Sequence, residues 1–166
     1  MSLIIRPAQT KDHDAIWAIL KPVFRAGDTY TIDRDISRAN ALDYWCGTAH
    51  AAFVAEYSGE ILGTYYMRRN QAGGGAHVCD CGYMTAKAAQ GRGVARAMLD
   101  HSLAEAPRRG YRAMQYNFVV ATNTRAIATW EKAGFRTVGR LPAAFRHPAD
   151  GYVDALVMWK DLKDGN

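Results

Sequence analysis

A helix that joins two apolar strands near the middle of the chain is the feature that most limits what this sequence can fold into. Residues 77–85 and 112–120 are rich in apolar side chains, and residues 94–106 between them repeat apolar positions at helical spacing. Antiparallel neighbours need only a short turn, whereas a parallel pair needs a crossover of about a dozen residues or more. The sequence therefore predicts one parallel pair of strands with a helical crossover.

The rest of the chain predicts antiparallel strands and further helices. The remaining strands are expected at 3–6, 51–57, 61–69, 135–141 and 152–160, with a loop at 142–151. A first helix should start at Thr10 as its N-cap, be kinked or ended by Pro22 and stop at Gly27. Other helices are expected at 37–46 and from 123 to 134. Together these segments predict an α+β fold, with a mixed, mostly antiparallel central sheet of about seven strands and helices on both faces, in a single domain spanning 1–166.

The composition and charge argue against several classes of protein. No stretch of about 18 apolar residues is present, so no membrane-spanning helix is predicted. Residues 1–7 lack the basic and then apolar layout of a secretory signal, which favours a cytoplasmic location. The formal net charge of +5 suits an anionic ligand. No dense basic stripe with interleaved aromatic residues indicates binding to nucleic acid.

The cysteines predict neither a disulfide framework nor a metal site. The three are Cys46, Cys79 and Cys81. Two of them are too close in sequence for an ordinary disulfide, and the total is odd, which favours a reducing compartment. A zinc site would need a second close pair of ligands, and none follows. We therefore expect Cys79 and Cys81 to be small buried side chains, and no metal to be bound.

The segment Gln90-Gly91-Arg92-Gly93-Val94-Ala95, between a strand and a helix, is the clearest candidate ligand site. Its two glycines allow a tight turn that exposes backbone amides, and the helix start adds the positive end of the helix dipole. Arg92 and Arg96 add positive charge, so a pyrophosphate suits the turn. A simple structural turn would also explain the glycines. The spacing is not that of a Walker P-loop, and Arg96 stands where the dinucleotide fingerprint has its third glycine.

Two blocks of the sequence resemble the motifs of the GNAT family of N-acetyltransferases. The family signature Gln/Arg-x-x-Gly-x-Gly/Ala is matched by Gln90, Gly93 and Ala95. The second motif, Asn-x-x-Ala-x-x-x-Tyr-x-x-x-Gly-Phe, is similar to the block with Asn123, Ala126, Trp130, Gly134 and Phe135. The resemblance covers nearly the whole chain. It implies a GNAT-like fold and an acetyltransferase that uses acetyl-coenzyme A (acetyl-CoA).

The resemblance also implies which residues bind the cofactor. In the family, the strand before the signature splays from the next strand, and the pantetheine arm lies in the gap like an added strand. Carried over, backbone groups for pantetheine would come from Tyr83, Met84 and Thr85. The pyrophosphate turn would consist of Gln90, Gly91, Arg92, Gly93, Val94, Ala95 and Arg96. Asn123 would reach the arm near its sulfur, although it would equally serve as a plain helix N-cap.

Trp130 departs from the family pattern. Family members commonly have a tyrosine here that protonates the departing thiolate, whereas an indole donates a hydrogen bond but delivers no proton near neutral pH. We expect Trp130 to line the cofactor channel. The acid would then be another tyrosine, with Tyr116 and Tyr152 as candidates, or a water molecule. It could also be absent, because a thiol with a pKa of about 8.5 is a tolerable leaving group.

The acceptor site is expected among the first helices, the middle strands and the last hairpin loop. Candidates for a catalytic role are Asp80, Tyr30 and His147. Candidates for binding the acceptor are Asp33, Asn117 and Arg146, and residues 28–38 are expected to form a mobile lid. Asp80 is the preferred base, because it is the only carboxylate in the strand that leads into the turn. Along that strand it shares a face with Gly82 and Met84, but a bulge would reverse the faces, and a solvent-facing or salt-bridged aspartate is the alternative.

The sequence thus predicts an enzyme that moves the acetyl group of acetyl-CoA to the amine of a small molecule. A weaker resemblance, carried by 116–119, 139–142 and 152–155, is to the subgroup with the fungal azetidine-2-carboxylate acetyltransferases. It implies an amino-acid-like acceptor. A non-catalytic module that binds acetyl-CoA and a protein or peptide N-acetyltransferase are the alternatives. Because dimers are frequent in the family, the resemblance also implies a homodimer.

Overall fold

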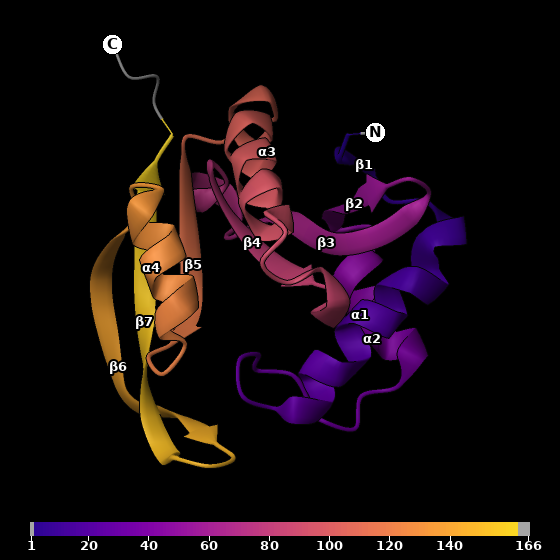
Figure 1. Ribbon diagram of the computed structural model, residues 1–166. Coiled ribbons are helices and arrows are strands. Elements are labelled where there is room, and N and C mark those ends of the chain that lie inside the picture. Colours follow the sequence, from indigo (N-terminus) through magenta and orange to yellow (C-terminus); the bar gives the residue numbers. More distant parts are fainter. Residues whose placement is uncertain (1, 163–166) are drawn as a thin grey trace.

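Seven strands form one mixed sheet in the computed structural model, which describes residues 2–162 (Figure 1). The strands are β1 (Ile4–Pro7), β2 (His50–Tyr57), β3 (Glu60–Arg69), β4 (Val78–Thr85), β5 (Ala113–Val120), β6 (Arg136–His147) and β7 (Gly151–Asp161). Their order across the sheet is β1-β2-β3-β4-β5-β7-β6. Met1 and residues 163–166 of the expected domain lie outside the described residues.

The predicted parallel pair is present but short. Within the described chain, β4 and β5 pair in parallel at Val78 with Ala113 and at Cys79 with Met114. Helix α3 (Val94–Arg108) makes the crossover, and the other neighbouring strands are antiparallel. Beyond Cys79 the two strands diverge, and a register shift with β7 in the middle of β5 marks the bend. The predicted mixed, mostly antiparallel sheet is confirmed, and its middle contains a gap.

Helices cover both faces of the sheet (Figure 1). Helices α1 (His13–Ala26) and α2 (Arg38–Cys46) lie against one face, and α3 and α4 (Thr124–Lys132) lie against the other. The core beneath α1 and α2 includes Ile16, Leu20, Phe24, Trp45, Val54, Tyr66 and Met84. The core beneath α3 and α4 includes Tyr65, Met67, Met98, Leu99, Met114, Tyr116 and Met158. Neighbouring residues of β3 alternate between the two cores, as the pleat of a strand requires.

The expected loop at 142–151 is wrong. Strand β6 extends to His147, and its last residues pair with the start of β7, with His147 opposite Gly151. The sequence suggested a loop because Pro142 cannot donate to a strand ladder. Proline is tolerated on edge strands, and β6 is the edge of this sheet. A register shift between Leu141 and Phe145 accommodates the irregular backbone.

The first helix begins later than expected and continues past its proline. Thr10 does not cap α1 but starts a short 3-10 turn, Thr10–Asp12, and α1 follows from His13. Pro22 lies inside α1 without ending it, because the buried apolar face holds the helix against the sheet. The expected end is confirmed, since Gly27 follows with a φ of 66°.

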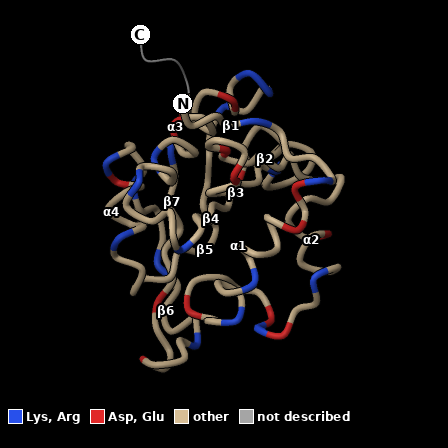
Figure 2. The backbone as a smooth tube through the Cα atoms, turned by 45° about the vertical axis from the view of Figure 1, so that its right-hand side comes forward, with Lys and Arg blue, Asp and Glu red and all other residues tan. Residues whose placement is uncertain are grey.

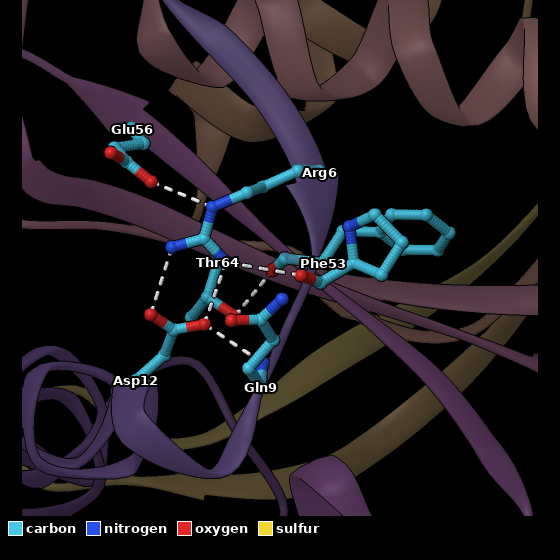
Figure 3. Close-up of polar contacts among 7 residues, drawn as sticks. Arg6, Gln9, Asp12, Phe53, Glu56 and Thr64 are labelled. Atoms are coloured by element: carbon cyan, nitrogen blue, oxygen red, sulfur yellow. Dashed lines mark hydrogen bonds and ion pairs between the residues drawn. The ribbon is translucent and has the colours of Figure 1, made fainter.

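A network of polar groups fixes the start of α1 to the edge of the sheet (Figure 3). Arg6 on β1 donates from Nη1 and Nη2 to the Asp12 carboxylate at 2.7 and 2.9 Å, and from Nε to Glu56 of β2 at 2.6 Å. Asp12 also accepts from the backbone N–H of Gln9 at 2.8 Å. Its hydrogen bonds with the Arg6 guanidinium hold the pKa of the Asp12 carboxyl below its usual value. This buried carboxylate is therefore satisfied by its own neighbours.

Many charged residues of the described chain lie on the helices and turns that surround the sheet. Lys and Arg segments alternate with Asp and Glu segments along the outer helices and turns (Figure 2). No helix among residues 2–162 has the length and apolar character needed to cross a bilayer. Two aspartates in the described chain are buried, Asp12 and Asp80. Asp12 is held by Arg6 and Gln9, whereas Asp80 lies on β4, the strand that borders the gap between β4 and β5.

Candidate functional site

The gap between β4 and β5 exposes backbone groups of β4. Ala86, just after the strand, donates its N–H to Leu62 O at 2.8 Å. At the other end of the pair, Asn70 donates to Val78 O at 2.9 Å. Because bonded and non-bonded positions alternate in an antiparallel ladder, the even-numbered residues of β4 bond to β3. The backbone N–H and C=O groups that point into the gap are therefore those of Cys81, Tyr83 and Thr85.

The same alternation corrects one predicted cofactor contact. Tyr83 and Thr85 face the gap with their backbone groups, but Met84 is in register with Thr64 and bonds to β3. Met84 therefore offers no backbone group to a ligand in the gap, and it borders the adjoining cavity instead. The Tyr83 carbonyl accepts a hydrogen bond from the Tyr30 hydroxyl at 3.1 Å, so Tyr30 reaches the rim of the gap.

The turn before α3 presents free amides and open space. Gly91 and Gly93 have φ angles of 76° and 79°, in the left-handed region that favours glycine. The first bond inside α3 runs from Ala97 N to Gly93 O at 3.0 Å, so the amides of 94–96 have no acceptor within the helix. A Cβ on either glycine would meet no atom within 4 Å. The turn is an open cradle of N–H groups at the positive end of a helix dipole, which suits an anion.

Two arginines flank this cradle on the surface. The Arg92 guanidinium lies 5.8 Å from the centre of the Tyr57 ring. Arg96 donates from Nε to both carboxylate oxygens of Asp100, at 2.9 and 3.0 Å, which offsets part of its charge. Gln90 is exposed at the same edge. The residues of the predicted pyrophosphate turn are thus gathered at one place, with their amides and cations accessible.

A cavity of about 340 Å³ adjoins the gap, with walls from α1 and the segment after it, from α2, from β3, β4 and β5, and from α4. Its aromatic lining consists of Tyr30, Tyr44, Tyr66, Tyr83, Tyr116, Phe118 and Trp130. Its main polar lining consists of Arg68, Asp80, Asn117 and Asn123. A wider groove of about 1240 Å³ runs between α1 and the turn after β2, and meets the cavity near Thr85 and Gln90. The buried carboxylate of the groove, Asp12, is fully engaged by Arg6 and Gln9. The smaller cavity holds the other buried carboxylate, Asp80, so we place the chemistry there.

Asp80 is a buried carboxylate with a perturbed pKa. Strand β4 contains no bulge, so Asp80 shares the face of Gly82 and Met84 toward α1 and α2. Its Oδ2 atom accepts from Arg68 Nη2 at 3.0 Å and from Arg68 Nε at 3.2 Å, and the residue is 6% exposed. Burial raises its pKa to about 6, although the Arg68 charge opposes this rise. Asp80 is therefore salt-bridged and also poised to accept a proton near neutral pH.

Asn117 belongs to a chain of side-chain amides at the far end of the cavity. Its Nδ2 atom donates to Asn70 Oδ1 at 2.6 Å, and its Oδ1 atom accepts from Gln115 Nε2 at 2.9 Å. The chain links the end of β3 to β5. One N–H of the Asn117 amide remains for a ligand, since a side-chain amide carries two donors.

Trp130 packs in an aromatic cluster on the α4 side of the gap. Its ring centre lies 5.2 Å from that of Tyr83 and 5.0 Å from that of Tyr116. The Tyr83 hydroxyl is 2.6 Å from Ser102 Oγ and 3.1 Å from the Tyr116 hydroxyl. Burial raises the pKa of both tyrosines well above its usual value, so neither releases a proton readily. Asn123 starts α4 nearby, and its Oδ1 accepts from Ala126 N at 3.4 Å.

Tyr152 and Tyr30 are two further candidates for acid or base, and neither is placed for that role. Tyr152 is 71% exposed and does not line the cavity. Burial also raises the pKa of Tyr30 above its usual value, which keeps its proton in place. Tyr30 is thus arranged to donate a hydrogen bond and not to act as a base.

Three of the predicted acceptor residues do not line the cavity, namely Asp33, Arg146 and His147. His147 Nδ1 accepts from the backbone N–H groups of Ala149 and Asp150, at 3.2 and 3.1 Å, and so holds the tight turn between β6 and β7. Arg146 is exposed near the end of β6, and Asp33 is exposed in the segment before α2. The expected hairpin loop is a strand pair, which keeps these β6 side chains at the sheet edge.

Tyr44, Tyr66 and Arg68 are among the cavity residues that sequence reasoning missed. The last two are identified only by the register of β3 with β4, which places Arg68 opposite Asp80 and Tyr66 opposite Gly82. A Cβ on Gly82 would lie 2.5 Å from the Tyr66 ring, so the glycine lets that ring lie flat across the strand. Tyr44 comes from α2 and meets the others only through tertiary packing, with its hydroxyl 3.3 Å from that of Tyr66.

Comparisons with known proteins agree with this geometry. The family model described as "Acetyltransferase (GNAT) family" matches residues 14–135. N-acetyltransferase aca1 of Schizosaccharomyces pombe is 29% identical over an alignment 148 residues long that covers 79% of this chain and 71% of that protein. Among solved structures, a GCN5-related N-acetyltransferase from Kribbella flavida is 39% identical with a TM-score of 0.90, covering 96% of this chain and 97% of its own. A putative acetyltransferase from Salmonella typhimurium, yncA, solved with its cofactor acetyl-CoA, is 21% identical with a TM-score of 0.86, covering 100% of this chain and 97% of its own. The chain therefore belongs to the GNAT family and is an acetyl-CoA-dependent acetyltransferase.

Proposed function

We propose that this enzyme acetylates the amine of a small, amino-acid-like molecule, with Asp80 as the general base. The observation that carries the proposal is the position of Asp80, a buried carboxylate that faces a small cavity on a strand whose edge borders the gap. A peptide acceptor would need an open groove at the base, whereas Asp80 lines the cavity of about 340 Å³ and not the wider groove, which suits a small molecule. A non-catalytic module would have no need of a carboxylate with a pKa of about 6 at this point.

The residues around the gap fit acetyl-CoA. The open cradle at Gly91 and Gly93, with the amides of 94–96, would hold the pyrophosphate. The backbone groups of Tyr83 and Thr85 would pair with the pantetheine arm as an added strand would. Asn123 and Trp130 would border the arm near its sulfur. When bound there, the cofactor supplies an acetyl group activated as a thioester.

Asp80 would prepare the acceptor for attack. A free amine with a pKa near about 10 is almost entirely protonated at neutral pH, so it must lose a proton first. Asp80 takes that proton and passes it to solvent. The amine nitrogen then forms a bond to the acetyl carbon while the carbon–sulfur bond breaks, and the thiolate leaves with the electron pair. The second nitrogen proton ends on the thiolate, so one amide, one thiol and one released proton result.

The departing thiolate has no evident side-chain acid. Trp130 delivers no proton near neutral pH, and burial raises the pKa values of Tyr83 and Tyr116. We propose that the thiolate leaves without a dedicated acid, because a thiol pKa of about 8.5 makes it a tolerable leaving group. A cytoplasmic location, a single domain over 1–166 and a homodimer remain predictions from the sequence.

The test is acetyl transfer with purified enzyme. The protein is incubated with acetyl-CoA and a panel of small amines, free amino acids and short peptides, and thiol release is followed. We expect release with small amines or amino acids and little with peptides. Release only with peptides would favour a peptide acetyltransferase. Tight binding of acetyl-CoA with no release for any acceptor would favour the non-catalytic module.

A further inference from the structure

Arg68 is the one cation among the residues that line the cavity, and Asp80 is the one carboxylate. The two face each other across the β3–β4 ladder, where Arg68 is in register with Asp80. Their side chains form a salt bridge of 3.0 Å. The reaction accounts for Asp80 as the base, but it does not by itself explain why a guanidinium lines the same cavity.

The salt bridge uses only part of the guanidinium. Both hydrogen bonds come from Nε and one Nη2 hydrogen, and both end on Oδ2 of Asp80. A guanidinium has five N–H donors, so three remain, and no acceptor among residues 2–162 takes them. The other oxygen, Oδ1 of Asp80, has no side-chain partner in the described chain. Both charged groups thus keep unused hydrogen-bonding capacity.

Two aromatic rings hold the guanidinium in place. The Cζ atom of Arg68 lies 5.5 Å from the centre of the Tyr66 ring and 6.0 Å from that of Tyr44. These rings limit the rotamers of the side chain and shield it from bulk water, while 32% of the side chain stays exposed. A planar fork fixed in this way matches the two oxygens of a carboxylate.

We infer that Arg68 binds the carboxylate of the acceptor while Asp80 receives the neighbouring ammonium, so that the acceptor is a free amino acid. This inference rests on the proposed function. The arrangement places a positive and a negative group side by side in the cavity, and a zwitterionic amino acid carries the complementary pair on adjacent atoms. Aromatic walls and the small volume restrict the side chain of this amino acid to a small apolar one.

A second role for Arg68 must be separated from this one. The guanidinium also lowers the proton affinity of Asp80, so removing it would slow every acceptor, whatever its structure. The ratio of kcat/KM between an amino acid and its own amide cancels that shared effect. The two substrates differ only in the carboxylate. The amide has the less basic amine, so intrinsic reactivity favours the amide and opposes the expected result.

The experiment measures kcat/KM for small L-amino acids, such as alanine and valine, and for their amides. Wild-type enzyme should prefer the amino acid by about a hundredfold or more, the scale of about two charge-assisted hydrogen bonds. In Arg68→Gln the preference should fall to within about threefold of unity, with the loss in the KM of the amino acid. Arg68→Lys, which keeps the charge but not the fork, should lie between. Arg69→Gln removes the same charge from the next, exposed residue and should keep the wild-type preference.

The possible outcomes separate the role of Arg68 from the proposed function of the enzyme. If Arg68→Gln slows amino acid and amide by the same factor, Arg68 only positions Asp80 and the inference is overturned. If wild-type enzyme acetylates amides as well as amino acids, the inference fails without any variant, and the proposed function stands. If it acetylates neither, both fail. A thermal melt of each variant confirms that it is folded.

Discussion

Replacing Asp80 with asparagine should stabilise the protein at neutral pH while it removes the activity. Burial raises the pKa of this carboxyl from 3.8 to about 6. Between those values the folded protein binds more protons than the unfolded chain, so the free energy of unfolding falls as pH rises. A shift of about 2 pKa units corresponds to a destabilisation of the folded protein by about 3 kcal/mol. This destabilisation is fully present above about pH 7 and absent below about pH 4. Asparagine resembles the protonated acid and has no such dependence.

Urea unfolding at two pH values measures this effect. Between about pH 4.5 and about pH 7.5, the free energy of unfolding of Asp80→Asn relative to wild type should rise by about 2 kcal/mol. Asp14→Asn is a matched control, because the Asp14 side chain is 92% exposed, and it should show no comparable change. If the free energies of unfolding of Asp80→Asn and wild type differ by the same amount at both pH values, Asp80 is not a destabilised buried carboxylate.

Turnover completes the test of Asp80. Wild-type activity should rise with pH through about 6 and then level off, because the base must be ionised. Asp80→Asn should lose activity by a factor of about 10² to 10⁴, the range for a removed acid–base group. A variant with wild-type turnover and an unchanged pH profile would show that another group accepts the proton.

Three further substitutions test other parts of the structure. Gly93→Val should abolish binding of acetyl-CoA in calorimetry, because its side chain would fill the cradle, whereas Gly110→Val, with a similar φ of 86° at the far end of α3, should keep the affinity at a similar loss of stability. Trp130→Phe should keep most of the turnover, and a loss of about a hundredfold with acetyl-CoA still bound would show that the indole N–H takes part in the chemistry. Thr64→Val should lower the free energy of unfolding by about 1–3 kcal/mol, because it leaves the Trp45 indole N–H buried without its 3.0 Å acceptor. The same change made in a Trp45→Phe background leaves no N–H unpaired and should therefore cost less. An equal loss of stability in both backgrounds would show that the hydrogen bond is unimportant.

The topology could be predicted from the sequence because it depends on local patterns. The helical crossover required a parallel pair, and the short interval between the strands expected at 51–57 and 61–69 required an antiparallel pair. The cradle was equally local, since both its glycines and its helix lie within a few residues. The length of β6 was not predictable in this way, because Pro142 signals a break unless the strand is known to be at the edge of the sheet.

The acceptor cavity depends on register and tertiary packing, which the sequence shows less directly. The face of Asp80 remained open because a single bulge in β4 would have reversed it, and the structure contains none. Arg68 becomes a candidate only once it is known to lie opposite Asp80. His147 was a candidate for a catalytic role because histidine titrates near neutrality. In the structure its Nδ1 atom instead accepts two backbone hydrogen bonds in a turn.

The divergence of β4 from β5 has a consequence for how a ligand enters. Two neighbouring strands with unpaired backbone groups would be expected to form hydrogen bonds with each other. A ligand that binds between them would then have to break those hydrogen bonds. Here the rings of Tyr83, Tyr116 and Trp130 pack together beside the gap, and the hydrogen bond between Asn70 and Asn117 ties the end of β3 to β5, so both strands are held in their diverged positions. The binding slot is therefore preorganised, so strand addition completes the sheet without first undoing any of it.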